Sequence, residues 1–506
     1  MRTCAVLVWM FFAVSAAMLG TTVPARAQKS ADTLRATVRD RLPDIDFYHN
    51  NLRLGLIVAQ HVWDGLIYRD PATFQIRPAL ATEWRASSPT TLDFTLRPGV
   101  HFQNGDEFSA DDVLYTINHV LHEHGTAVPS NYDWIAGAER IDDQHVRITL
   151  RRVFPAALEY LALVLPIYPR AYRERVGLAG FATHPIGTGP YTVAHAVPGT
   201  LTLERNDAYF GGAKGHPAIR RLVFTELPGP SGAVEALLDG RADWIWQFDP
   251  GRVEDILRKP SLTALRAESM RIEYLAMDAA GRTGPGDPFH DRRVREAVFA
   301  AIDRAAFARL VGGGARVLAG PCYPTQFGCD TAGTPAITYD PVRARKLLAE
   351  AGYPDGFDTT LSTYLLPAWS RAIVGDLGAV GIRARVLQFT PDPFTRRSRR
   401  GLDPMELANW GSYSINDVSA ILPYFFAGGP SDYVRDPKVE ALVERGGAVT
   451  DPDERRVAYG AAIRRIMEQF SWLPLTTEVT TYAFSRDLDF TPFPDEIPRF
   501  YLARWR

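Results

Sequence analysis

The sequence predicts an α/β protein in which the chain crosses several times between lobes. Strand and helix signals alternate along the whole chain, which is the pattern of α/β architecture. No Pro-, Gly- or Ser-rich linker separates domains in the 506 residues, so we expect lobes built from several chain segments, with two crossings that form a hinge. The composition, 46% hydrophobic and 23% charged, is that of a globular protein with a large core.

Charge and composition exclude several classes of protein. The formal net charge of −2 gives no argument for a nucleic-acid partner or an anionic membrane surface. The composition also rules out a collagen, a disordered acidic chain and a disulfide-dense mini-protein. Positive charge is almost all arginine, which we interpret as genome bias.

The N-terminal residues carry the pattern of a secretory signal peptide. Arg2 is followed by an apolar run over 5–20, and a polar stretch then leads to Ala25-Arg26-Ala27. This order predicts cleavage after Ala27 and removal of residues 1–27. A membrane anchor is the alternative, but the run is short for a span of about 20 residues. No later stretch is long and apolar enough for a span, so we expect an exported, soluble protein.

Two half-buried strands and the helix between them are predicted in the first third of the chain. Apolar residues alternate over 92–96 and over 146–150. Ser109 is a good N-cap, and Asp112 stands three residues later as its capping-box partner. The pattern therefore predicts a helix that begins after Ser109.

Two more helices are predicted from their first residues. Asp340-Pro341 and Asp451-Pro452 each place an aspartate at the N-cap and a proline at the first helical position. Gly352 is expected to end the first of these helices, and the second should run to about Phe470.

Two cysteines remain after the expected cleavage. Cys322 and Cys329 are seven residues apart, and an oxidising compartment favours a disulfide between them. A two-cysteine metal site is the alternative, but no second pair of ligands lies nearby in the sequence. We therefore expect a bridge that closes a small loop.

The sequence contains no recognisable catalytic or cofactor signature. There is no Gly-x-Ser-x-Gly elbow, no His-Glu-x-x-His motif and no phosphate-binding loop. The run Gly312-Gly313-Gly314 lacks the spacing of a dinucleotide site and is expected to be a flexible loop. His119, His122 and His124 could hold a metal, but a solvated helix end is the favoured interpretation. We expect no cofactor, no metal and no catalysis.

Aromatic residues gather near predicted turns. Aromatic side chains supply a large contact area with few rotatable bonds, which suits a cleft that encloses a ligand. Taken together they favour a binding function. The pairs concerned are Tyr132 and Trp134, Trp244 and Trp246, Tyr364 and Trp369, and Trp410 and Tyr413.

Long strings with many glycine and aromatic residues follow one another along the sequence. The first are HVWDGLIYRD, IRPALATEW and LRPGVHFQNGDEFSADDVLYTINHVL. They are followed by PIGTGPYTV, LERNDAYFGG, AVEALLDGRADW and DPFHDRRVREAVFAAIDR, and then by YDPVRARKLLAEAGYPDGF and ANWGSYSIND. In this order, the strings resemble the family 5 extracellular solute-binding proteins, which are the dipeptide-, oligopeptide- and nickel-binding components of ABC importers.

The resemblance implies a type II periplasmic-binding-protein fold with two α/β lobes and an extra subdomain inserted in lobe I. The hinge crossings would fall near Tyr274-Leu275 and from Thr481 to Phe484. The expected boundaries are 28–67, 188–275 and 485–506 for lobe I, 68–187 for the inserted subdomain, and 276–484 for lobe II.

The same resemblance implies a function. The protein would be a periplasmic, monomeric solute-binding component that captures a peptide-like solute between its lobes. It would then deliver this small molecule or short peptide to an ABC permease and ATPase complex at the inner membrane. A secreted hydrolase or lyase, and a receptor that presents a solute to another protein, are the alternatives.

The ligand class is open because one residue departs from the pattern of peptide-binding relatives. In those relatives an aspartate three residues after the tryptophan of this segment pairs with the peptide amino group. Here the tryptophan is Trp410 and the third position is Tyr413, whose phenol cannot offset a buried ammonium charge. Asp417 could replace the aspartate; otherwise an opine, an oligosaccharide or a blocked peptide becomes the expected ligand.

The predicted ligand contacts come from all three parts of the chain. From lobe II they are Trp410, Ser412, Tyr413, Asn416, Asp417 and Tyr364; from lobe I, Asn50, Asn51 and Trp244; and from the inserted subdomain, Tyr132 and Trp134.

Overall fold

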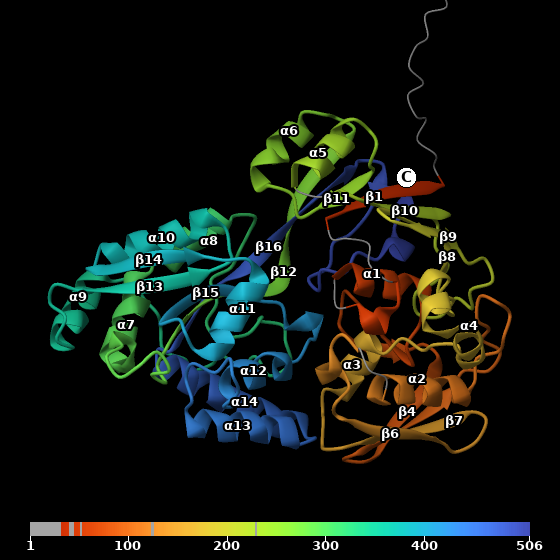
Figure 1. Cartoon of the computed structure of the whole chain (residues 1–506), viewed down its shortest axis with the longest axis horizontal. Helices are drawn as coiled ribbons and strands as arrows, with labels where there is room; N and C mark the ends of the chain where they lie inside the picture. The colour runs from red at the N-terminus through yellow and green to blue at the C-terminus, as the bar shows by residue number, and fades with distance from the viewer. Residues whose placement is uncertain (1–31, 40–44, 51–52, 123–125, 228–229) are drawn as a thin grey trace, which may run out of the picture.

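A ten-stranded mixed sheet runs through the molecule and connects two lobes (Figure 1). The computed structural model describes residues 32–39, 45–50, 53–122, 126–227 and 230–506. The expected signal peptide, Asn51 and His124 lie outside the described residues. In order across the sheet, the strands are β14 (Ile382–Gln388), β13 (Phe357–Thr363), β15 (Met405–Trp410), β12 (Leu262–Met277), β16 (Trp472–Ser485), β11 (Trp244–Trp246), β1 (Thr33–Val38), β10 (Arg221–Glu226), β9 (Thr200–Arg205) and β8 (Tyr191–Val197).

Lobe I surrounds the half of the sheet from β11 to β8. The C-terminal residues return to this lobe, where Phe490 and Phe500 pack in the same core as Leu34 of β1 and Ile57 of α1. Both ends of the described chain therefore belong to lobe I (Figure 1). Its helices and its small C-terminal sheet are α1 (Arg53–Val62), α5 (Pro230–Leu238), α6 (Val253–Leu257), β17 (Leu488–Asp489) and β18 (Arg504–Trp505).

A separate four-stranded sheet forms within the range 68–187 expected for the inserted subdomain. Two of its strands and the helix between them agree with the sequence patterns, and the Asp112 carboxylate accepts a 2.8 Å hydrogen bond from the Ser109 N–H, as the capping box predicts. The elements here are β2 (Ile67–Arg69), β3 (Ile76–Pro78), β4 (Ala81–Ser88), β5 (Thr91–Leu96), α2 (Ala110–His122), β6 (Ile135–Arg140), β7 (His145–Leu150), α3 (Ala157–Val164) and α4 (Arg170–Thr183).

Lobe II carries most of the helices. The two predicted aspartate N-caps are confirmed: Asp340 accepts a hydrogen bond from the Arg343 N–H, and Asp451 accepts from the N–H groups of Asp453 and Glu454. The helices are α7 (Arg292–Ala301), α8 (Arg304–Val311), α9 (Pro341–Glu350), α10 (Pro367–Gly378), α11 (Pro391–Arg400), α12 (Leu422–Phe426), α13 (Pro437–Ala448) and α14 (Pro452–Glu468).

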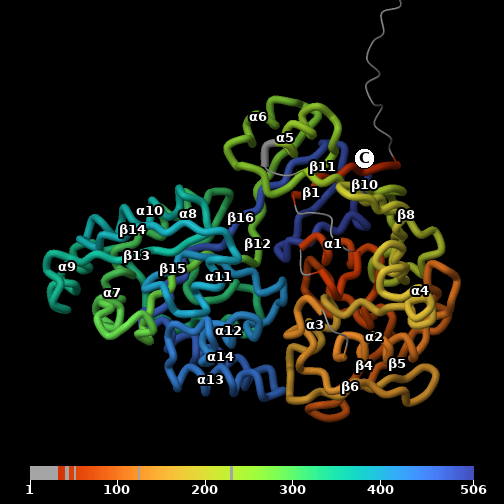
Figure 2. Tube along the Cα trace, viewed as in Figure 1, coloured from red at the N-terminus to blue at the C-terminus, as the bar shows by residue number. Residues whose placement is uncertain are grey.

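The long antiparallel strands β12 and β16 join the two lobes (Figure 2). At one end Trp244 of β11 pairs with Phe484 of β16, and at the other end Tyr274 of β12 pairs with Ala408 of β15. The register between β12 and β16 is irregular from Glu268 to Tyr274. The crossing between lobes lies between these two paired ends. The crossings expected at Tyr274-Leu275 and at Thr481 to Phe484 lie at the two ends of this stretch, where β15 pairs with β12 and β11 pairs with β16.

A disulfide joins Cys322 to Cys329, as the spacing predicted, with an S–S distance of 2.02 Å. The loop that it closes packs against the chain after Trp410. The Phe327 N–H donates to the Asn416 carbonyl at 3.0 Å, and the Val418 N–H donates to the Phe327 carbonyl at 3.0 Å. The bridge therefore supports a segment next to the cavity described below.

Candidate functional site

A cavity of about 350 Å³ lies between the lobes, beside the hinge strands. Both lobes and the inserted subdomain contribute to its walls, so a bound molecule would contact all three. The residues that line it are Phe47, Asn50, Arg53 and Leu56 from lobe I; Val128, Asn131 and Val164 from the insert; Arg271 from β12; and Tyr364, Asn409, Trp410, Gly411, Ser412 and Tyr413 from lobe II.

Five predicted contact residues meet at this cavity. Asn50, Tyr364, Trp410, Ser412 and Tyr413 all line it, although they come from three distant parts of the sequence. The Trp410 indole is fixed by a 3.0 Å hydrogen bond from its Nε1 to the Ala420 carbonyl and by stacking on Tyr424 at 4.3 Å. A wall that is already rigid loses little entropy when a ligand binds.

Three predicted aromatic residues lie outside the cavity, in cores. Trp244 is 1% exposed and packs edge-on against Phe500 in lobe I. The Tyr132 hydroxyl donates to the Val164 carbonyl at 3.0 Å, and Trp134 stacks on Phe154. These side chains pack behind the cavity walls and stabilise them. Burial in a core is the commoner use of a large aromatic residue.

Asp417 and Asn416 are also occupied elsewhere. Asp417 is 3% exposed and accepts two hydrogen bonds from Arg455, at 3.0 and 2.9 Å, besides one from the Ser419 N–H. Its charge is therefore already neutralised inside lobe II. Asn416 lines a different cavity, beside the disulfide loop, and its N–H donates to Glu159 at 3.1 Å. Neither residue lines the interlobe cavity.

The turn that follows Trp410 has an unusual backbone. Ser412, Tyr413 and Ser414 have φ values of 49°, 49° and 64°, three successive non-glycine residues in the left-handed region. Each costs on the order of 1–2 kcal/mol, so the surrounding structure must hold the turn in place. We call residues 411–416 the pocket loop.

Two arginines hold the pocket loop: Arg53 comes from lobe I, and Arg69 comes from β2 of the inserted subdomain. Arg53 donates to the Ser414 hydroxyl and Arg69 donates to the Ser414 carbonyl, both at 2.6 Å. The Ser414 hydroxyl in turn donates to the Asp495 carbonyl at 2.7 Å. These bonds cross between lobes, and they fix the strained turn at the site where the two lobes meet.

Arg53 and Arg271 are the charged residues of the cavity wall, and the sequence patterns did not indicate either. Arg271 lies against the pocket loop, where a Cβ on Gly411 would approach its Cζ to 3.2 Å. It uses Nη2 to bond Glu496 at 3.1 Å and places Nε 3.5 Å from Glu478. Its Nη1 makes no hydrogen bond within the described residues and can donate to a ligand.

Three glutamates, Glu273, Glu478 and Glu496, stand behind these arginines. Burial raises the pKa of Glu273 far above the usual value, and neighbouring Glu478 adds to this. Burial also raises the pKa of Glu478, although Arg271 opposes it. For Glu496, Arg271 and Arg53 outweigh burial and lower the pKa. The raised pKa values of Glu273 and Glu478 therefore reduce the negative charge that stands behind the two arginines.

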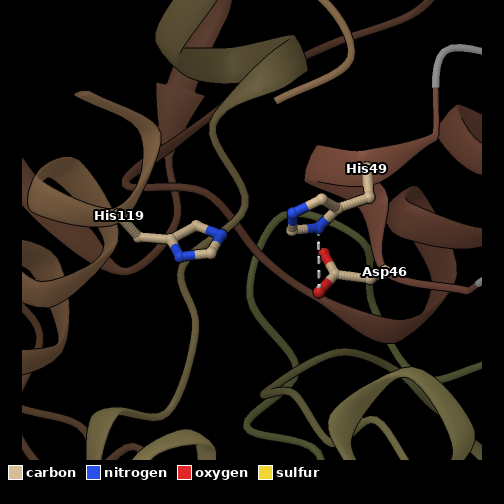
Figure 3. A group of neighbouring side chains, drawn as sticks. All are labelled: Asp46, His49 and His119. Atoms are coloured by element: carbon tan, nitrogen blue, oxygen red, sulfur yellow. Dashed lines mark ion pairs between the residues drawn. The ribbon is translucent and has the colours of Figure 1, made fainter. Parts of the chain in front are cut away.

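A group of possible metal ligands lies in the insert and lobe I, as Figure 3 shows for Asp46, His49 and His119. The Asp46 carboxylate already accepts a hydrogen bond from Tyr168 at 2.8 Å and pairs with Arg173 at 3.0 Å. Since the arginine would repel a cation at this carboxylate, the group is better explained as a structural network. His119 is 6% exposed, so the solvated helix end expected for it is wrong.

Within the described ranges, no helix has the length and apolar character needed to cross a membrane.

Comparison with known proteins reveals a family and several relatives. The family model of bacterial extracellular solute-binding proteins, family 5, matches residues 75–432. Di/tripeptide-binding protein 2 of Pseudomonas aeruginosa is 29% identical over 82% of this chain and 84% of its own length. The glutathione-binding protein GsiB of Salmonella paratyphi A is 25% identical over 93% of this chain and 94% of its own.

Solved structures share the fold at low sequence identity. The ABC transporter substrate-binding protein CtaP of Listeria monocytogenes superposes with a TM-score of 0.83 at 19% identity, over 94% of this chain and all of that chain. The periplasmic binding protein DppA of Helicobacter pylori, in complex with a peptide, gives 0.76 at 21% identity, over 94% and 98%. The predicted fold class, a type II periplasmic binding protein, is confirmed.

Proposed function

Since the chain belongs to family 5 of the bacterial extracellular solute-binding proteins, we propose that it is the periplasmic component of an ABC importer for a small, carboxylate-bearing solute. One observation carries the choice of solute: Arg53 and Arg271 line the interlobe cavity, and no carboxylate does so within the described residues. Peptides and glutathione, for which the two relatives are named, both carry carboxylates. Opines and blocked peptides share this chemistry, whereas a neutral oligosaccharide lacks it.

Capture follows from the position of the cavity between the lobes. A solute that contacts both lobes binds the closed form better than the open form, and so increases the population of the closed form. Binding at about micromolar concentration requires about −8 kcal/mol in total. The closed protein would then dock on the permease and release the solute without chemical change.

Native mass spectrometry of the protein purified from its own periplasm tests this function. We expect one bound molecule per chain, which is released on denaturation and carries at least one carboxylate or comparable anionic group. Recovery of a neutral sugar would contradict the charge assignment. Release of a cleaved product during turnover of an added solute would instead support a secreted hydrolase.

The affinity for an anionic solute is expected to fall as the pH rises. The raised pKa values of Glu273 and Glu478 keep protons on this pair where an ordinary glutamate is ionised. When the pH passes these pKa values, the pair gains negative charge beside Arg271, so the dissociation constant increases by up to about tenfold per pH unit. Calorimetric titration of acetyl-Ala-Ala from about pH 5 to about pH 9 measures the change.

The substitution Glu478→Gln provides the control for this pH dependence. The amide keeps the shape of the carboxyl group next to Asn409 and Arg271, but it cannot ionise. We expect the variant to bind more tightly than the wild type at alkaline pH and to show a flatter profile. An unchanged slope in the variant would assign the titration to another group.

A further inference from the structure

A second and larger chamber opens from the first cavity. Its volume is about 770 Å³, more than twice the 350 Å³ of the first. The two share Asn131, Trp410 and Tyr413, so they are neighbouring compartments of one interlobe cleft. Figure 1 shows α3 of the insert opposite α12 and α13 of lobe II, and the chamber takes its walls from these elements.

Aromatic rings cover much of the chamber wall. Aromatic side chains bind flat apolar groups by stacking and edge contacts, at about 0.5–1.5 kcal/mol per ring pair beyond the effect of buried area. Small residues such as Ala156, Ala420 and Ala427 leave open space between the rings. The aromatic residues are Phe154 and Tyr160 from the insert, and Trp410, Tyr413, Tyr424 and Tyr459 from lobe II.

Tyr413 stands between the two compartments. Its side chain is 49% exposed, its backbone is in the left-handed region, and its ring meets Trp410 edge-on at 5.6 Å. The strained backbone holds a large exposed ring in a position where no packing in a core requires it. A residue held in this way suits contact with a ligand that passes from one compartment to the other.

The charges orient a solute across the two compartments. Arg152 and Arg455 line the chamber, but Asp133 and Asp417 pair with them at 3.2 and 2.9 Å. Glu440 and Glu444 of α13 also border it. The chamber therefore disfavours a carboxylate, which the arginines of the first cavity attract.

We propose that the chamber is a subsite for an aromatic or other flat apolar group of the solute, whose carboxylate lies in the first cavity. The preferred solute then has an anionic end and a bulky apolar end, and the part that links them lies beside Tyr413. This inference rests on the proposed function, because it assumes that the carboxylate of the solute binds in the first cavity.

Two probes that differ only in their N-terminal group test the chamber. Acetyl-Ala-Ala and pyrenylacetyl-Ala-Ala carry the same carboxylate, and the fluorescence of pyrene reports its removal from water. We expect pyrenylacetyl-Ala-Ala to bind at least about tenfold more tightly, as the burial of a large aromatic group predicts. The full mature chain is used for both titrations.

A variant that fills the chamber provides the second arm. Ala427 lines the chamber and is exposed, so Ala427→Trp adds a large ring without disturbing a core. We expect this variant to lose the tenfold advantage of the pyrene probe and to bind acetyl-Ala-Ala as the wild type does. Ala196→Trp, at an exposed site on β8 in lobe I, should change neither affinity.

The outcomes separate this inference from the proposed function. If both probes bind equally, or if Ala427→Trp leaves the pyrene advantage intact, the subsite assignment is wrong while the anionic solute stands. If neither probe binds, the carboxylate assignment fails, and the chamber assignment that depends on it fails as well.

Discussion

Replacement of Arg271 by Gln is expected to weaken the binding of acetyl-Ala-Ala by about 10- to 100-fold. Arg271 lines the cavity and has Nη1 available for a ligand. A hydrogen bond to a charged group is worth about 1.5–3 kcal/mol, which corresponds to this loss in affinity. Isothermal titration calorimetry on wild type and variant measures the difference.

Two further variants keep this test informative. Arg271 also pairs with Glu496, so Arg271→Gln can lower stability, and thermal unfolding must show that the variant is folded at the temperature of the titration. Arg271→Lys retains the charge but loses the planar fork, so it should bind with intermediate affinity. Arg383→Gln, at a surface ion pair with Asp358, is the matched control. Wild-type affinity in both Arg271 variants would remove this residue from the site.

The parts of the fold that local chemistry determines could be predicted from the sequence. Asp340 and Asp451 cap their helices as predicted, and Asp112 accepts from the Ser109 N–H as its capping-box partner, because a cap depends on residues within one turn. The disulfide between Cys322 and Cys329 likewise depends on a short loop. The position of the hinge depends on which neighbouring strands pair with β12 and β16, and these pairings join residues far apart in the sequence.

The candidate site was predictable only where aromatic residues mark it. Trp410 and Tyr413 stand out in the sequence and line the cavity, whereas Trp244 stands out equally and lies in a core. A three-residue strand gives no periodicity that could show which way its side chains point. Arg53 and Arg271 were missed because arginine is the common basic residue of this chain, and only folding shows which arginines meet between the lobes.

Replacement of Asp417 by Asn is expected to lower the free energy of unfolding by about 3–5 kcal/mol. The substitution leaves the Arg455 guanidinium buried and without its counter-charge, and removal of one partner from a buried ion pair has an effect of this size. Arg455 and Asp417 side chains are 5% and 4% exposed. Urea unfolding of the variant measures the loss. Asp453→Asn, at an exposed pair with Arg456, should change stability by about 0.5 kcal/mol or less.

The same variant decides whether Asp417 takes the place of the aspartate that binds the amino group in peptide-binding relatives. If it did, Asp417→Asn would weaken the binding of Ala-Ala and spare acetyl-Ala-Ala, because only the first has an ammonium group. In the structure the Asp417 carboxylate is paired with Arg455. We therefore expect the ratio of the affinities for Ala-Ala and acetyl-Ala-Ala to be the same in the variant and the wild type. A selective loss of Ala-Ala binding would show that the loop rearranges when a peptide binds. An unchanged ratio leaves the carboxylate, and not the amine, as the group by which this protein holds its solute.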